Sequence, residues 1–126
     1  MFEDQEAVAT IAVKDLERGK KFYQGTLGMQ SLDGEEPGVL TLKSGPSKVF
    51  VYESQYAGTN QATVLTWVVD DVDGTVRALK DKGVSFEHYD LPEMTHEGDV
   101  HVAGDMRAAW FKDPDGNILA LVSSQP

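Results

Sequence analysis

The sequence predicts an α+β chain built from two tandem copies of a β-α-β-β-β unit. In each half, an apolar run is followed by an aspartate and then by a helical pattern of apolar residues. The segment 13–16 (VKDL) of the first half aligns with 69–72 (VDDV) of the second at an offset of 56. The chain is one domain long. We therefore expect a single domain, 1–126, made of modules at about 6–54 and 62–123.

The first half gives the order strand, helix and three strands. Residues 6–13 (EAVATIAV) are a predicted strand. Asp15 is placed to cap the helix that follows, and Gly28 is placed to end it. The remaining predicted strands are 29–32, 39–42 and 49–53, with turns at 33–34 and 44–47.

The second half repeats this order with one long interruption. Residues 62–69 are a predicted strand, and the aspartates of 70–73 open a helix. A strand is predicted over 84–89. Residues 90–104 then read as a long irregular loop, a kind of segment that is usually a functional lid or a mobile tether.

A β-hairpin is predicted over 107–122. The segment 113–117 (DPDGN) supplies the turn residues, and short apolar runs flank it. Because side chains alternate between the two faces of a strand, Ala108 and Trp110 share one face of the first strand. Ile118 and Ala120 likewise share one face of the second strand.

Composition and charge exclude several classes of partner. The chain has a formal net charge of −10 and a sequence pI near 4.5, so it lacks the basic surface that nucleic acids and anionic membranes attract. It has no cysteine, which excludes disulfides and thiolate metal sites. No apolar run is long enough to span a membrane, and the acidic N-terminus lacks the features of a signal peptide. We expect a cytoplasmic protein.

Two segments resemble the vicinal-oxygen-chelate superfamily, which includes glyoxalases, bleomycin-resistance proteins, extradiol dioxygenases and fosfomycin-modifying enzymes. The opening at 11–28 (IAVKDLERGKKFYQGTLG) is similar to the superfamily's strand followed by DLxxxxxFYxxxLG. The DPDGN hairpin resembles its C-terminal hairpin. The resemblance implies that the strands of the two modules form a cupped mixed sheet with the helices outside. It also implies a homodimer.

In metal-dependent members of this superfamily, four His, Gln or Glu side chains in the cup bind a divalent metal, in keeping with the O and N donors that such ions prefer. A typical C-terminal hairpin reads DPDGNxxE, and Ala120 stands where the glutamate would be. The other three positions fall on Val8, Val51 and Val64. All four residues are apolar, so we expect neither a metal nor another cofactor.

The resemblance also places Trp110 inside the cup. An aromatic ring in a cavity with an apolar floor offers a stacking surface. The predicted function is therefore metal-free, bleomycin-resistance-like binding of a small apolar or aromatic molecule. The predicted ligand-binding residues are Val8, Thr10, Val51, Val64, Thr66, Trp110 and Ala120.

Two alternatives stay open. One is a glyoxalase-like lyase or isomerase, or a dioxygenase-type enzyme, that acts through residues outside the usual metal positions. The candidates are His88, Glu53 and the polar residues of the long loop, His96, Glu97, Asp99 and His101. The other is a structural or regulatory protein in which Trp110 fills the cup. The remaining large aromatic residues of the strands, Phe50, Tyr52, Trp67 and Phe111, are predicted to be core.

Overall fold

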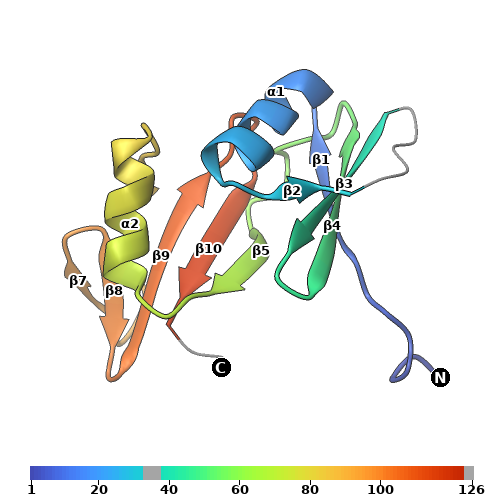
Figure 1. Cartoon of the computed structure of the whole chain (residues 1–126). Coiled ribbons are helices and arrows are strands. Elements are labelled where there is room, and N and C mark those ends of the chain that lie inside the picture. Colours follow the sequence, from blue (N-terminus) through green and yellow to red (C-terminus); the bar gives the residue numbers. More distant parts are fainter. Residues whose placement is uncertain (33–37, 124–126) are drawn as a thin grey trace. The chain divides into compact units, whose positions relative to one another are not determined.

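The computed structural model describes residues 1–32 and 38–123. These residues form an α+β architecture with two mixed sheets, as predicted (Figure 1). The chain divides into two compact units, Met1–Ala57 and Gly58–Pro126. That the two units make up one domain stays a prediction. Among the described residues, no helix has the length and apolar character needed to span a membrane.

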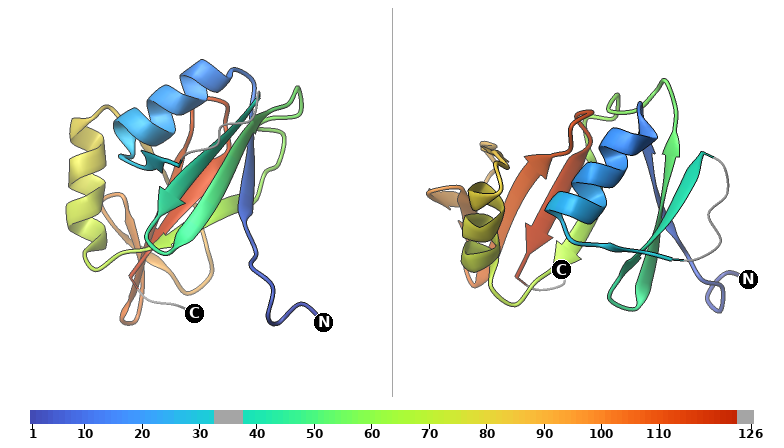
Figure 2. Two further views of the ribbon diagram at one scale, coloured as in Figure 1. Left: turned by 45° about the vertical axis from the view of Figure 1, so that its right-hand side comes forward. Right: turned by 45° about the horizontal axis from the view of Figure 1, so that its top comes forward.

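The first unit has a four-stranded sheet. In sheet order, its strands are β1 (Ala9–Val13), β4 (Ser47–Glu53), β3 (Val39–Ser44) and β2 (Gln30–Ser31). β1 and β4 are parallel, and the other pairs are antiparallel (Figure 2). The strands lie within a few residues of their predicted positions, and the turn predicted at 33–34 falls outside the described residues. Ile11 and Val51 are paired across β1 and β4 and are both buried in the core.

One helix follows β1, and its winding changes along its length. α1 (Leu16–Lys20) begins after Asp15, whose side chain accepts a hydrogen bond from the Arg18 N–H, as the predicted cap requires. The helix continues as η1 (Lys21–Thr26), a π-helix. Gly19 is buried, and an added Cβ would stand 3.2 Å from the methyl groups of Val13. The glycine therefore lets this helix pack closely on the sheet.

The second unit repeats the topology of the first. Its sheet order is β5 (Thr63–Val68), β10 (Ile118–Val122), β9 (Met106–Lys112), β8 (Val100–Ala103) and β7 (Thr95–Glu97). β5 and β10 are parallel, and the others are antiparallel. α2 (Val72–Asp81) begins after Asp71, which accepts from the Gly74 N–H, and it packs against β8 and β9 (Figure 1).

The segment between α2 and β9 differs from its prediction. The predicted strand over 84–89 is only β6 (Phe86–Glu87), and the predicted loop contains the hairpin of β7 and β8. β6 and β8 both pair with the edge of β9 that β10 leaves free. The polar residues of 95–101 hide the strand pattern, although Val100 and Val102 alternate with His101. Gly98, at φ +64°, takes the left-handed conformation that the tight turn requires.

The DPDGN turn is held by its own side chains. One carboxylate oxygen of Asp113 accepts from the N–H groups of Asp115 and Asn117, both at 2.9 Å. The side-chain oxygen of Asn117 accepts from the Gly58 N–H at 3.3 Å. Asp113 and Asn117 are both buried. The turn therefore also fixes the start of the second unit.

Gly58→Ala is expected to destabilise the protein strongly. A Cβ atom at this position would overlap the backbone carbonyl oxygen of Asp115, and Gly58 has φ +74°. Gly45→Ala is the matched control, since Gly45 has φ +57° but open space around the added Cβ. The control should lose about 1–2 kcal/mol of unfolding free energy, because alanine disfavours the left-handed conformation. Gly58→Ala should lose clearly more. Equal losses in urea unfolding would contradict the close approach of Gly58 to the turn.

Candidate ligand-binding site

One face of the second unit's sheet combines apolar, hydroxyl and aromatic side chains. Ala120 of β10 pairs with Thr66 of β5 on one side and with Trp110 of β9 on the other. Ala108, two residues before Trp110, pairs with His101 of β8. Residues paired across strands share a face of the sheet. We call this surface, formed by Thr66, Ala108, Trp110, His101 and Ala120, the Trp110 face.

The indole of Trp110 is held in one position. Its Nε1–H donates to the hydroxyl of Thr63 at 3.1 Å. The rings of Tyr89 and His101 stand nearly perpendicular to it, with centroids 5.5 Å and 4.8 Å away. The side chain is half-buried. Trp110 therefore has the features of a fixed aromatic surface.

His101 lies beside Trp110 and packs with His96 and His88, a grouping around the indole that the sequence did not predict. His101 is fully buried, and its Nε2 accepts a hydrogen bond from the backbone N–H of Tyr89 at 3.0 Å. The ring centroid of His96 lies 4.5 Å from that of His101 and 5.5 Å from that of His88. In residues 1–32 and 38–123, no group of three or more His, Asp or Glu side chains is placed to hold a metal ion.

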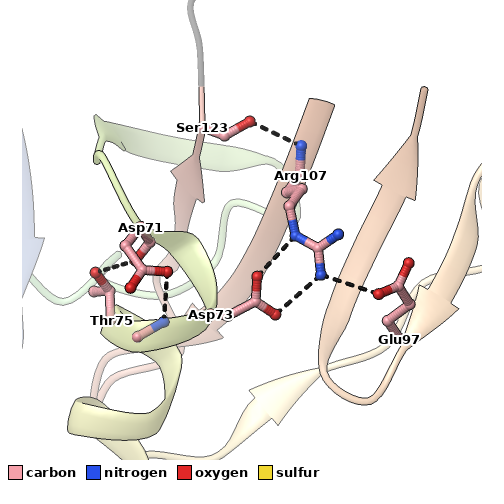
Figure 3. Close-up of polar contacts among 7 residues, drawn as sticks. Asp71, Asp73, Thr75, Glu97, Arg107 and Ser123 are labelled. Atoms are coloured by element: carbon pink, nitrogen blue, oxygen red, sulfur yellow. Dashed lines mark hydrogen bonds and ion pairs between the residues drawn. The ribbon is translucent and has the colours of Figure 1, made fainter. Parts of the chain in front are cut away.

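The opposite face of β9 anchors the surrounding elements (Figure 3). The Arg107 guanidinium donates to both carboxylate oxygens of Asp73 on α2, at 2.8 and 3.0 Å, and to Glu97 on β7 at 3.2 Å. These hydrogen bonds from Arg107 lower the pKa of Asp73. The Arg107 backbone N–H donates to the hydroxyl of Ser123 at 2.9 Å. One side chain thus ties α2 and the β7–β8 hairpin to β9.

A second anchor holds the tip of the same hairpin. Asp99, in the turn between β7 and β8, accepts from Lys80 of α2 at 2.6 Å and contacts Nε2 of His88 at 2.7 Å. The hydrogen bond from Lys80 is the main cause of a lowered pKa at Asp99, and the contact with His88 adds to it. His88, predicted as a half-exposed strand residue, is exposed and lies just after β6.

Burial shifts two groups beside the indole in ways that keep both uncharged. Burial lowers the pKa of His101, with smaller contributions from the charges of His96 and His88, while the backbone at Tyr89 and Ala108 opposes the shift. Burial and the charge of Glu87 raise the pKa of Tyr89. Near neutral pH, His101 is therefore an imidazole and Tyr89 a phenol.

Val64 and Trp67 both belong to β5. Val64 of β5 is half-buried and lies opposite a register shift between Ile118 and Leu119 of β10. Trp67 points to the other face of the sheet and is half-buried, so it is less enclosed than the core residue that was predicted. Its ring stacks on the buried Phe111 at 6.3 Å.

One predicted position in the first unit needs correction. Val51 pairs with Ile11, is fully buried, and lies on the opposite face from Thr10. Thr10 pairs with Phe50, just as Thr66, 56 residues later, pairs with Ala120. Phe50 is therefore the counterpart of Ala120, and the sequence register was wrong by one residue.

The same shift changes the core assignment in β4. Phe50 is half-buried and Tyr52 is 38% exposed, so neither is a core residue as predicted. Thr10 is exposed on β1, and Val8 precedes that strand and is half-buried. Glu53, at the end of β4, is exposed.

Comparison with protein families settles the resemblance. The model of the Glyoxalase/Bleomycin resistance protein/Dioxygenase superfamily matches residues 7–121. The chain belongs to this superfamily. None of the curated proteins compared with the chain matches it.

Several solved structures share the fold. A putative glyoxalase family protein from Bacillus anthracis has a TM-score of 0.70 and 17% identity, with 99% of this chain and 98% of that chain covered. The antibiotic binding protein TnmS3 from Streptomyces sp. CB03234 has a TM-score of 0.62 and 24% identity, with 96% of each chain covered. The fosfomycin resistance protein FosX from Mesorhizobium loti has a TM-score of 0.68 and 16% identity, with 99% and 95% covered.

The metal of the superfamily's metal-dependent members does not fit the residues of this member. The positions expected to supply ligands carry Val8, Val64, Ala120 and, after the correction, Phe50. None of these side chains has a nitrogen or oxygen atom, and a divalent ion needs such donors. The neighbouring Thr10 and Thr66 offer only neutral hydroxyls.

The free energy of unfolding is expected to fall as the pH is lowered from 6.5 through the depressed pKa of His101. In that window the unfolded chain binds a proton that the buried imidazole does not, so acid favours unfolding; above 6.5 this contribution is constant. Asp73 and Asp99 lose their contributions only below 3.8, because their pKa values are lowered from that value. Urea unfolding at closely spaced pH values measures the effect.

His101→Gln is the matched variant for this measurement. A glutamine oxygen can accept from the Tyr89 N–H without titrating, so the slope assigned to His101 should disappear. If the stability of the variant and of the unmodified protein depends on pH in the same way, groups other than His101 cause the effect.

Proposed function

We propose that the protein binds a small, largely apolar or aromatic molecule against the Trp110 face, without a metal ion. The observation that carries this proposal is the half-buried indole, held by Thr63, Tyr89 and His101 next to Ala120. Ala120 replaces the ligand that a metal site needs. Its methyl group is buried and puts no polar atom beside the ring.

The physical basis of binding is burial and stacking. An aromatic molecule on an indole loses water from both apolar surfaces, and stacking adds about 0.5–1.5 kcal/mol to that gain. The hydrogen bond to Thr63 and the two perpendicular rings fix the indole before binding, which reduces the entropy that binding costs.

Two proteins of the same fold give this proposal indirect support. TnmS3 is an antibiotic binding protein, and FosX is a fosfomycin resistance protein. At 24% and 16% identity these likenesses concern the fold. They show that proteins of this fold are associated with small molecules, and the stacking surface is this chain's own feature.

The alternative is an enzyme that acts through residues outside the usual metal positions. The observation in its favour is the contact of His88 with Asp99, since a carboxylate can orient a histidine for proton transfer. Asp99 is also paired with Lys80, however, and Glu97 is held by Arg107. These links describe an anchored hairpin better than a reactive group, so we favour binding. If Trp110 only fills space, the protein has a structural role.

Further expectations stay predictions. These are the parts of Val8 and Thr10 in ligand binding, the homodimer, the cytoplasmic location and the absence of nucleic-acid and membrane partners. An exposed sheet edge favours dimerisation, because a second chain can cover or pair with the free backbone N–H and C=O groups of the edge strand. Val51 lies on the other face of the sheet, so Phe50 replaces it among the residues that we expect to bind the ligand.

Trp110→Ala is expected to abolish ligand binding while reducing stability only modestly, by less than about 2 kcal/mol. The measurement is thermal unfolding with a panel of aromatic compounds. A compound at ten times its dissociation constant should stabilise the unmodified protein by about 1.4 kcal/mol and the variant not at all. The stabilisation should persist in a metal chelator.

Trp67→Ala is the matched control, because Trp67 lies on the opposite face and stacks on Phe111. It should lose about 3 kcal/mol of stability and still respond to the ligand. Large and equal losses of stability in both variants would identify Trp110 as a core residue. Loss of the response in the chelator would restore a role for a metal.

A further inference from the structure

Two buried polar atoms beside Trp110 make no hydrogen bond among the described residues. They are the hydroxyl oxygen of Tyr89 and Nδ1 of His101. Buried polar groups are nearly always paired, because a group that has lost its water without gaining a partner destabilises the fold. Two such atoms in one place need an explanation.

Both atoms belong to rings that border the same indole. Tyr89 and His101 each stand edge-on to Trp110, and their own ring centroids are 6.2 Å apart. Three polar side chains around these rings have other partners. The Thr63 hydroxyl accepts from Trp110, Nε2 of His96 contacts the Tyr89 carbonyl, and Glu87 pairs with Lys112.

Both unpaired groups are hydrogen-bond donors. Nε2 of His101 accepts from the Tyr89 N–H, so in the neutral ring the proton is on Nδ1. Burial keeps this ring neutral by lowering its pKa, and burial raises the pKa of the Tyr89 hydroxyl, which therefore keeps its proton. Two donors that make no hydrogen bond among the described residues are complementary to an oxygen with two lone pairs.

We propose that the molecule bound on the Trp110 face is an aromatic carbonyl compound, whose oxygen accepts from the Tyr89 hydroxyl, from Nδ1–H of His101 or from both. This inference rests on the proposed function. The ring of the ligand lies against the indole, and the oxygen accepts from one donor or from both. A hydrocarbon of the same shape leaves the donors unpaired, so the pair selects for the carbonyl.

The test compares 2-acetylnaphthalene with 2-ethylnaphthalene, which share a ring system and nearly a shape. Each is titrated into the protein, and the indole N–H signal of Trp110 is followed by NMR, with Trp67→Phe to assign it. The ketone should bind at least about fivefold more tightly, the factor that one ordinary hydrogen bond contributes. Simple hydrophobicity favours the ethyl compound, so this order is informative.

Tyr89→Phe and His101→Gln each remove one donor and should reduce the preference for the ketone, in one of the two variants to parity or below. Tyr56→Phe is the control, because Tyr56 is 70% exposed and belongs to the first unit. It should leave the preference unchanged.

Equal affinities of the two compounds for the unmodified protein, with Trp110 shifting for both, would overturn the carbonyl inference and leave stacking on Trp110 standing. A preference that survives in both variants would overturn it as well. If neither compound moves the Trp110 signal, both the inference and the proposed function are wrong.

Discussion

The pairing of β9 with β6 and β8 on one edge is the constraint on which the candidate site depends. β6 pairs with the second half of β9 and β8 with the first half. The chain between them must leave that edge and return to it. Tyr89 follows directly after this departure, and His101 lies on the returning strand. Both rings therefore flank Trp110 because of how the backbone pairs.

Because side chains alternate along β9, its two faces have different roles. Arg107 and Phe111 point toward α2, where they bind Asp73 and pack with Trp67. Trp110 points the other way. The face that holds the fold together is thus separate from the face proposed to bind a ligand, so the indole can change with little effect on the anchors of the hairpin.

Order-of-magnitude energies show why two unpaired donors matter at an apolar site. An aromatic molecule that buries roughly 150 Å² gains about 4 kcal/mol at about 25 cal/mol per Å². Stacking adds about 1 kcal/mol, and the lost freedom of the ligand costs on the order of 4 kcal/mol or more. Because these contributions nearly cancel, a single hydrogen bond decides which aromatic molecule binds with useful affinity.

The sequence predicts the parts of the fold that rest on local chemistry. The Asp15 cap, the DPDGN turn and the repeat at an offset of 56 are readable because each depends on residues close together in the chain. The resemblance to the superfamily followed from the opening at 11–28, which contains Asp15, and from the DPDGN hairpin. Strand alternation also predicts that Trp67 lies on the face opposite Thr66, whereas the position of Trp110 followed from the family resemblance.

The rest depends on pairing between distant strands. A shift of one residue moved Val51 to the wrong face, and only the pairing of Thr10 with Phe50 corrects it. The β7–β8 hairpin was hidden by its polar residues, which are anchored by Lys80 and Arg107. The importance of His101 and Tyr89 was missed for the same reason. The only local signal was the alternation of Val100, His101 and Val102.

The central claim is that a ligand lies on the indole of Trp110. Intermolecular nuclear Overhauser contacts in a complex with an aromatic compound test it most directly, since the chain has only two tryptophans. The account predicts contacts between ligand protons and the Trp110 ring, and none with Trp67. Contacts with Trp67, or with a surface that does not include Trp110, would contradict it.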